Sequence, residues 1–88
     1  MILSKDYEII DITGEVLAIP VGSKAEISKD IFSFSNAAAF LLKELKEHRS
    51  EQQLVDCLVE QYDVDRQTAI MDVKRFISSI VEIGLIET

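Results

Sequence analysis

The chain has 88 residues, enough for one small domain with a modest hydrophobic core, and 48% of them are hydrophobic, which argues against a disordered chain. The formal net charge is −7, and only nine Lys and Arg residues are spread along the sequence. Phosphate contacts need clustered basic side chains, so this charge argues against a non-specific nucleic-acid binder and against docking on anionic membranes.

The N-terminal part of the chain predicts a β-hairpin. Residues 7–12 are rich in β-branched and aromatic residues, which favours a strand. Thr13-Gly14 fits a hairpin turn in which the glycine supplies a positive φ. The continuous apolar run at 16–21 then indicates a strand covered on both faces and ending at Pro20, which cannot donate to a ladder.

A third short strand is predicted at residues 31–34. Phe32 and Phe34 would share one of its faces, because alternate side chains of a strand point to the same side. Before it, residues 22–24 fit a turn or loop, and the segment 25–30 has no pattern that decides its structure.

Two helices are predicted next. Ser35 or Asn36 is the expected N-cap of the first. Its inward face comprises Ala38, Leu41, Leu42 and Leu45. Residues 50–53, Ser-Glu-Gln-Gln, match a capping box at the start of the second helix. That helix extends to about residue 62, and its apolar face comprises Leu54, Val55, Leu58, Val59 and Tyr62.

The last quarter of the chain predicts one long amphipathic helix. Asp65 is the expected N-cap, and Gly84 can end the helix in a left-handed conformation. The apolar residues repeat at the spacing of one helix face: Ala69, Ile70, Val73, Phe76, Ile77, Ile80 and Val81. Leu85 and Ile86 then indicate a short return strand.

The order of these elements, strands first and helices after, predicts an α+β fold. We expect a small three-stranded antiparallel sheet followed by a three-helix bundle, with residues 1–88 forming a single domain. The second and third helices with their short connection resemble a helix-turn-helix pair, and the terminal strand resembles the start of a wing, so the expected fold is winged-helix-like.

The chain also carries an ordered set of short motifs. They are Gly14-Glu15-Val16, Ile19-Pro20-Val21-Gly22, Ile31-Phe32-Ser33-Phe34-Ser35, Ala39-Phe40-Leu41-Leu42, Leu54-Val55, Glu60-Gln61-Tyr62-Asp63-Val64-Asp65, Asp72-Val73, Phe76-Ile77, Ile80 and Gly84-Leu85-Ile86. In this order and at these spacings they resemble the PqqD family, whose namesake carries the precursor peptide in pyrroloquinoline quinone biosynthesis. The resemblance covers nearly the whole chain.

The resemblance implies a peptide-binding adaptor without catalytic activity. Family members bind the leader segment of a ribosomally synthesised precursor peptide and present it to a modifying enzyme, often a radical SAM enzyme, a lasso-peptide protease or a cyclase. The leader adds as an antiparallel strand along the third strand and places apolar side chains in a groove beside the last helix. The implied peptide-binding residues are Ile31, Phe32, Ser33, Phe34, Asp72, Arg75, Phe76 and Ser79.

From the residues alone, the third strand and the groove both have open alternatives. Residues 31–34 lack the Pro and the charges that protect an edge strand, yet the residues alone favour an interior strand with two Phe rings in the core, and only the resemblance favours the open edge. On the last helix, one flank carries Asp72, Arg75 and Ser79, and the other carries Gln67, Met71, Lys74 and Ser78. Periodicity does not choose between these flanks, whereas the resemblance favours the first.

The sequence carries no arrangement that indicates catalysis, so we expect no cofactor and no metal. His48 stands alone at the polar end of a helix, and Cys57 lies beside a buried stripe, where a structural thiol is the expected role. No CxxC, HExxH, P-loop or GxGxxG motif occurs. A single cysteine, the absence of an apolar run of about 18 residues and the absence of a signal-peptide pattern predict a cytoplasmic protein.

Two other hypotheses remain open. A winged-helix transcription regulator would read DNA with the last helix, although that helix offers only Arg66, Lys74 and Arg75 against Asp72 and Glu82. An open edge strand also permits self-pairing, so a homodimer that forms without peptide is a further hypothesis.

Overall fold

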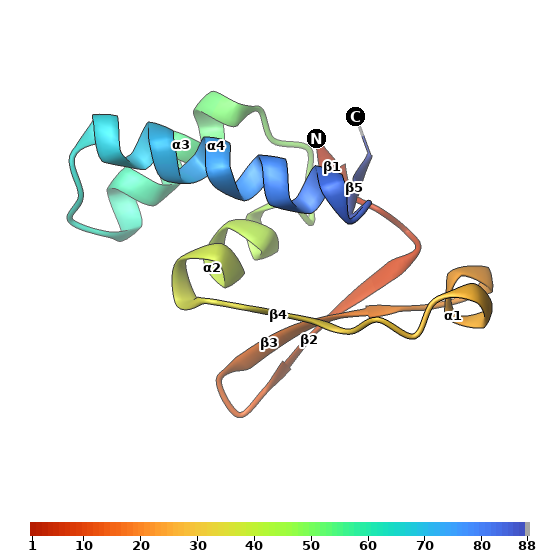
Figure 1. Cartoon of the computed structure of the whole chain (residues 1–88). Coiled ribbons are helices and arrows are strands. Elements are labelled where there is room, and N and C mark those ends of the chain that lie inside the picture. The colour runs from red at the N-terminus through yellow and green to blue at the C-terminus, as the bar shows by residue number, and fades with distance from the viewer. Residues whose placement is uncertain (88) are drawn as a thin grey trace.

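The structure, a computed structural model, describes residues 1–87 and contains a three-stranded sheet with its three longer helices gathered on one side of it (Figure 1). In chain order the elements are β1 (Ile2–Leu3), β2 (Tyr7–Ile12), β3 (Glu15–Pro20), α1 (Ser23–Ile27), β4 (Phe32–Phe34), α2 (Asn36–Glu44), α3 (Glu51–Gln61), α4 (Arg66–Glu82) and β5 (Ile86–Glu87). The strands β2, β3 and β4 are antiparallel neighbours in that order. The predicted α+β class is therefore confirmed.

The β2–β3 hairpin turns at Thr13 and Gly14, as predicted. Both residues have positive φ, 49° at Thr13 and 87° at Gly14, as the tight turn of a two-residue hairpin requires. The Asp11 carboxylate accepts a hydrogen bond from the Gly14 N–H at 3.2 Å and helps to hold the turn. The hairpin pairs six residues on each side, from Ile12 opposite Glu15 to Tyr7 opposite Pro20.

The strand predicted at 16–21 is displaced by one residue, and the prediction that both its faces are covered is wrong. Val16 and Ala18 are buried on the side of the helices, whereas Leu17 and Ile19 on the other side stay partly exposed. The apolar run misled because α2, α3 and α4 all lie on one side of the sheet (Figure 1). Its opposite side therefore carries aliphatic residues without a covering layer.

The helix caps form as predicted. The Ser35 hydroxyl accepts from the Ala38 N–H at 3.4 Å, and the Asp65 carboxylate accepts from the Thr68 N–H at 2.8 Å. At the start of α3, Ser50 and Gln53 form a reciprocal capping box. These bonds satisfy backbone donors that have no partner inside their own helix.

The core lies where α2, α3 and α4 meet above the sheet. Its fully buried large side chains are Leu41, Leu42, Leu45, Leu54, Ile80, Leu85 and Val73. On α4 the buried stripe is Ala69, Val73, Phe76 and Ile80, with Ile77 partly buried beside it. Ile70 and Val81 were predicted on this face but are 37% and 58% exposed, because each lies about 100° round the helix from the stripe.

Three further features were not predicted correctly. The strand predicted at Leu85-Ile86 is Ile86–Glu87, and it pairs with β1, a strand that the sequence analysis missed. This ribbon brings the two ends of the chain together (Figure 1). The loop predicted at residues 22–24 instead begins the short helix α1, which buries no residue and so leaves no apolar pattern in the sequence.

None of the helices that the structure describes is long and apolar enough to cross a membrane.

Candidate functional site

β4 is an edge strand, paired with β3 on one side only. The register fixes which of its backbone groups are free. The Val21 N–H donates to the Asp6 carbonyl at 2.8 Å, so the odd-numbered residues of β3 direct their backbone groups toward β2 and the even-numbered ones toward β4. On β4, Phe32 and Phe34 oppose Ala18 and Val16 and bond to β3.

Ser33 therefore directs its N–H and C=O away from the sheet, toward the open edge. Pro20 explains why the ladder is short. Its ring nitrogen lies on the side of β3 that faces β4 but carries no hydrogen, so no donor continues the ladder beyond Ala18 and Phe32.

A cleft of about 660 Å³ lies between the open edge of β4 and α4. One wall is β4, with Phe32, Ser33 and Phe34. The other wall is α4 and the residue after it, with Asp72, Arg75, Phe76, Ser79, Ile80, Glu82 and Ile83. Ser35 and three residues of α2, Ala37, Ala38 and Leu41, line it from the α2 side, and Leu58 adds to the lining. Small side chains at the start of α2 leave the space that a larger residue would fill.

Tyr7 holds the sheet and the end of α4 in their relative positions. Its ring packs against Phe32 with centroids 6.4 Å apart, and its hydroxyl donates to the Ile83 carbonyl at 3.4 Å. Both partners line the cleft, whereas Tyr7 itself is buried behind it. Tyr7 thus helps to set the separation of the two walls.

The cleft combines an apolar floor with a charged rim. Leu41, Phe76 and Ile80 are buried, and Phe32 and Phe34 are half-buried, so an apolar ligand would complete their burial. On the rim, Asp72 and Arg75 approach to 3.8 Å, and Arg75 is 74% exposed. An ion pair this exposed contributes roughly 0–1 kcal/mol, which leaves Arg75 available to another carboxylate.

Of the eight candidate residues from the sequence, all but Ile31 line this cleft. Ile31 precedes β4 and is 58% exposed. The flank of α4 that carries Asp72, Arg75 and Ser79 faces the cleft, whereas none of Gln67, Met71, Lys74 and Ser78 belongs to the lining. Leu41 and Ile80, in the floor of the cleft, were not among the predicted site residues. Helical periodicity predicts that a residue faces inward, but it does not tell whether that residue also lines a cleft.

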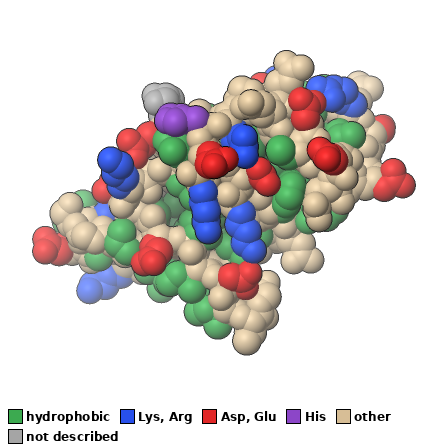
Figure 2. All heavy atoms as spheres, turned by 180° about the vertical axis from the view of Figure 1, so that it is seen from behind, with side chains coloured by type: hydrophobic (Ala, Val, Ile, Leu, Met, Phe, Trp, Pro, Cys, Tyr) green, Lys and Arg blue, Asp and Glu red, His purple; other side chains and the backbone are tan. Residues whose placement is uncertain are grey.

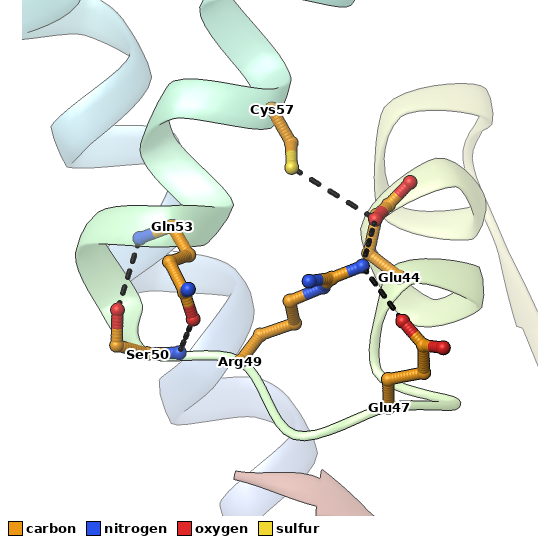
Figure 3. A network of polar contacts seen from close by, with 6 residues as sticks. All are labelled: Glu44, Glu47, Arg49, Ser50, Gln53 and Cys57. Carbon is orange, nitrogen blue, oxygen red and sulfur yellow. Dashed lines mark hydrogen bonds and ion pairs between the residues drawn. The ribbon is translucent and has the colours of Figure 1, made fainter.

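The partly buried Cys57 belongs to a polar network away from the cleft (Figure 3). Its thiol donates to Glu44 at 3.8 Å, and Arg49 bridges Glu44 at 3.4 Å and Glu47 at 3.0 Å. Burial raises the pKa of the Cys57 thiol, and the charge of Glu44 raises it further. The thiol therefore stays protonated near neutral pH, which fits a structural role better than a nucleophilic one. Among residues 1–87 no group of acidic, His and Cys side chains could hold a metal ion.

The fold and the cleft together define a winged-helix-like α+β domain with an open sheet edge beside its last helix. A sequence model of the family described as coenzyme PQQ synthesis protein D, PqqD, matches residues 15–86, so the chain belongs to the PqqD family. A search of curated proteins gives no match.

Two solved structures share this fold. One is TbiB1 in complex with the TbiA(beta) leader peptide, with 22% sequence identity, a TM-score of 0.82 and coverage of 99% of this chain and 95% of that one. The other is lasso peptide synthetase B1 complexed with the leader peptide, with 18% identity, a TM-score of 0.75 and coverage of 94% and 92%.

The alternative of a DNA-reading helix loses its support. The basic residues of α4 are each close to a carboxylate or few in number: Arg66 pairs with Asp56 at 2.8 Å, and Asp72 lies 3.8 Å from Arg75 and would repel a phosphate there. On the face that Figure 2 shows, Lys and Arg side chains are interspersed with Asp and Glu. Family membership points away from a duplex binder as well.

Proposed function

We propose that this chain is a non-catalytic adaptor, or peptide chaperone, in the biosynthesis of a ribosomally made natural product. It binds the leader of a precursor peptide as an added strand along β4 and presents the peptide to a modifying enzyme. The observation that carries the proposal is the unpaired edge of β4 beside the apolar cleft on α4.

The backbone supports strand addition. A guest strand needs donors and acceptors that the sheet has left free, and Ser33 offers one of each. β4 contains no Pro and no charged residue, the features by which proteins protect an exposed edge. Ile31 lies one alternation further along the same edge, so a guest strand can extend past β4 toward it.

The side chains support recognition of an apolar leader. A guest strand beside β4 would direct alternate side chains into the cleft, against Phe34, Phe76 and Leu41. Each fully buried Leu, Ile or Phe side chain contributes about 1.5–3 kcal/mol relative to an exposed one. Arg75 on the rim would pair with an acidic leader residue and would select register more than affinity.

The likeness to two leader-peptide complexes supports the choice of ligand. By the same reasoning the modifying enzyme is a radical SAM enzyme, a lasso-peptide protease or a cyclase. We propose further that residues 1–88 act as one recognition domain in the cytoplasm, with no cofactor of their own.

The test is a titration of the isotope-labelled chain with the synthetic leader from the same gene cluster, followed by amide NMR. We expect the largest shifts at Ile31 to Phe34 and on the flank of α4 that carries Asp72, Arg75 and Ser79. Shifts confined to α3 and to the Met71 flank of α4, or no shift at millimolar leader, would refute strand addition.

A further inference from the structure

The side of the sheet that faces away from the helices is largely apolar. Together its aliphatic residues form the outer sheet face, which comprises Ile10, Ile12, Leu17, Ile19 and Ile31. None of them packs against the core cluster, and Ile12 and Ile31 are 51% and 58% exposed. Figure 2 shows hydrophobic side chains gathered low on the molecule, where Figure 1 places the sheet.

The hairpin register makes four of these residues one contiguous patch. Ile10 lies directly opposite Leu17, and Ile12 and Ile19 follow on the same side of their strands. The partner of Ile19 across the hairpin is Glu8, and the partner of Ile12 is Glu15. The patch is therefore a block of aliphatic side chains with a glutamate at each of two opposite corners.

The charges on this face are of one sign. The strands β2, β3 and β4 contain no Lys, Arg or His. Asp11 points to the helix side, where Lys43 pairs with it at 3.0 Å, whereas Glu8 and Glu15 take part in none of the ion pairs among residues 1–87. The complement of this face is an apolar protein surface bordered by Lys or Arg side chains.

The same charges disfavour two other occupants. Stacking two copies face to face would bring the carboxylates of both together with no cation on either face to offset them. An anionic membrane would repel Glu8 and Glu15 in the same way. The face therefore fits a different protein with a basic border.

We infer that the outer sheet face docks the peptide-modifying enzyme, an inference that rests on the proposed function. A leader strand along β4 would lie at the edge of the sheet with its inward side chains in the cleft on the helix side. It would leave Ile10, Ile12 and Leu17 uncovered, so the enzyme and the leader can be bound together. Ile31, at the entrance to β4, lies where the two regions meet. An enzyme bound to the outer sheet face would therefore lie next to a leader bound along β4.

Two double variants test the inference with the purified modifying enzyme from the same gene cluster. Ile10→Thr with Leu17→Thr removes apolar surface and leaves a β-branched strand former at both positions. Glu8→Lys with Glu15→Lys reverses the corner charges. We expect each to weaken enzyme binding by about tenfold or more, and the charge reversal also to flatten its salt dependence. Leader affinity, measured separately on the isolated chain, should stay within about twofold of the wild-type value.

The matched control is Met71→Gln, which removes an exposed apolar side chain from α4 outside both surfaces and should leave both affinities unchanged. Wild-type enzyme affinity in both double variants, or no enzyme binding by the wild-type chain, would overturn the inference. So would a homodimer in light scattering that Ile10→Thr with Leu17→Thr dissociates. Enzyme binding without leader binding would instead refute the proposed function and leave the docking surface intact.

Discussion

Ser33 of β4 lies opposite Leu17 of β3 in a pair that exchanges no backbone hydrogen bond, so both backbone groups of Ser33 face outward. The pairs on either side, Phe32 with Ala18 and Phe34 with Val16, hold β4 to the sheet. A change at Ser33 can thus alter the open edge without breaking the ladder.

Ser33→Pro should weaken leader binding by about tenfold or more, because it removes the outward N–H and places a ring on the edge. Fluorescence anisotropy with a labelled leader measures the effect. Ser33→Ala is the matched control, since it keeps the N–H and should bind as the wild type does. Equal affinity of the Pro and Ala variants would place the leader elsewhere.

Phe34→Asp should also weaken leader binding by about tenfold or more, because it puts a charge on the apolar wall of the cleft. Isothermal titration calorimetry would show the loss together with a smaller negative heat-capacity change. Met71→Asp, on the opposite flank of α4, is the control and should leave the affinity unchanged. A leader that binds both variants equally well does not use this cleft.

Thr13→Asn should stabilise the fold by about 1 kcal/mol, because threonine holds a positive φ of 49° there and asparagine tolerates this conformation better. A change of this size raises Tm by about 4–8 °C in a domain of this length. Thermal unfolding followed by circular dichroism measures it. Gly14→Ala should lower Tm instead, and a Tm that Thr13→Asn fails to raise would show that the turn stores no strain.

Acid should destabilise the protein through Asp65 and Asp11. The hydrogen bond from Thr68 lowers the pKa of Asp65 below its ordinary value of 3.8, and the bond from Lys43 lowers the pKa of Asp11. A lowered pKa stabilises the fold fully above the ordinary value, and the contribution is lost as pH falls through the folded-state pKa. The contribution of these two carboxylates to Tm should therefore stay constant down to about pH 5 and decline below about pH 4, which thermal unfolding at a series of pH values measures.

Thermal unfolding of the variant Asp65→Ala across the same pH range separates the contribution of the Asp65 N-cap from that of Asp11. Its Tm should lie below that of the wild type at neutral pH, and the difference should narrow in acid, where the wild-type carboxylate is protonated too. A difference that stays constant across the range would mean that Asp65 acts without its charge.

Cys57 should react slowly with iodoacetamide near neutral pH, because its raised pKa leaves little thiolate. Mass spectrometry of timed samples gives the rate, and the urea-unfolded chain supplies the reference. Glu44→Gln should speed the reaction, since it removes a neighbouring charge that raises the pKa of the thiol. Equal rates in the folded and unfolded chain would contradict a shielded thiol.

The helices were predictable because their signals are local. Ser35, Ser50 and Asp65 each bond within a few residues, and the leucines of α2 and α3 repeat at helical spacing. The pairing of β1 with β5 was not predictable, since two-residue strands joined across the whole chain leave no periodic pattern. Helix α1 escaped for a similar reason, because its five residues bury nothing.

Only part of the cleft lining could be predicted from the sequence. The exposed rim of α4 offered two flanks, and the fold places the one with Asp72 and Arg75 opposite β4. Leu41 and Ile80 belong to the buried core and also line the cleft, and their helical spacing predicts only the first of these roles. The outer sheet face was not predicted either. The apolar run at 16–21 predicts a strand buried on both faces, but no helix covers the outer one.

The β1–β5 ribbon has a practical consequence for how the domain can be joined to other polypeptides. Neither of its strands contributes a residue to the cleft or to the outer sheet face. Because Ile2 pairs with Glu87, extensions at either end would leave from one spot. A reporter or a fused catalytic module can thus be attached through a short tether while the cleft and the outer sheet face stay accessible.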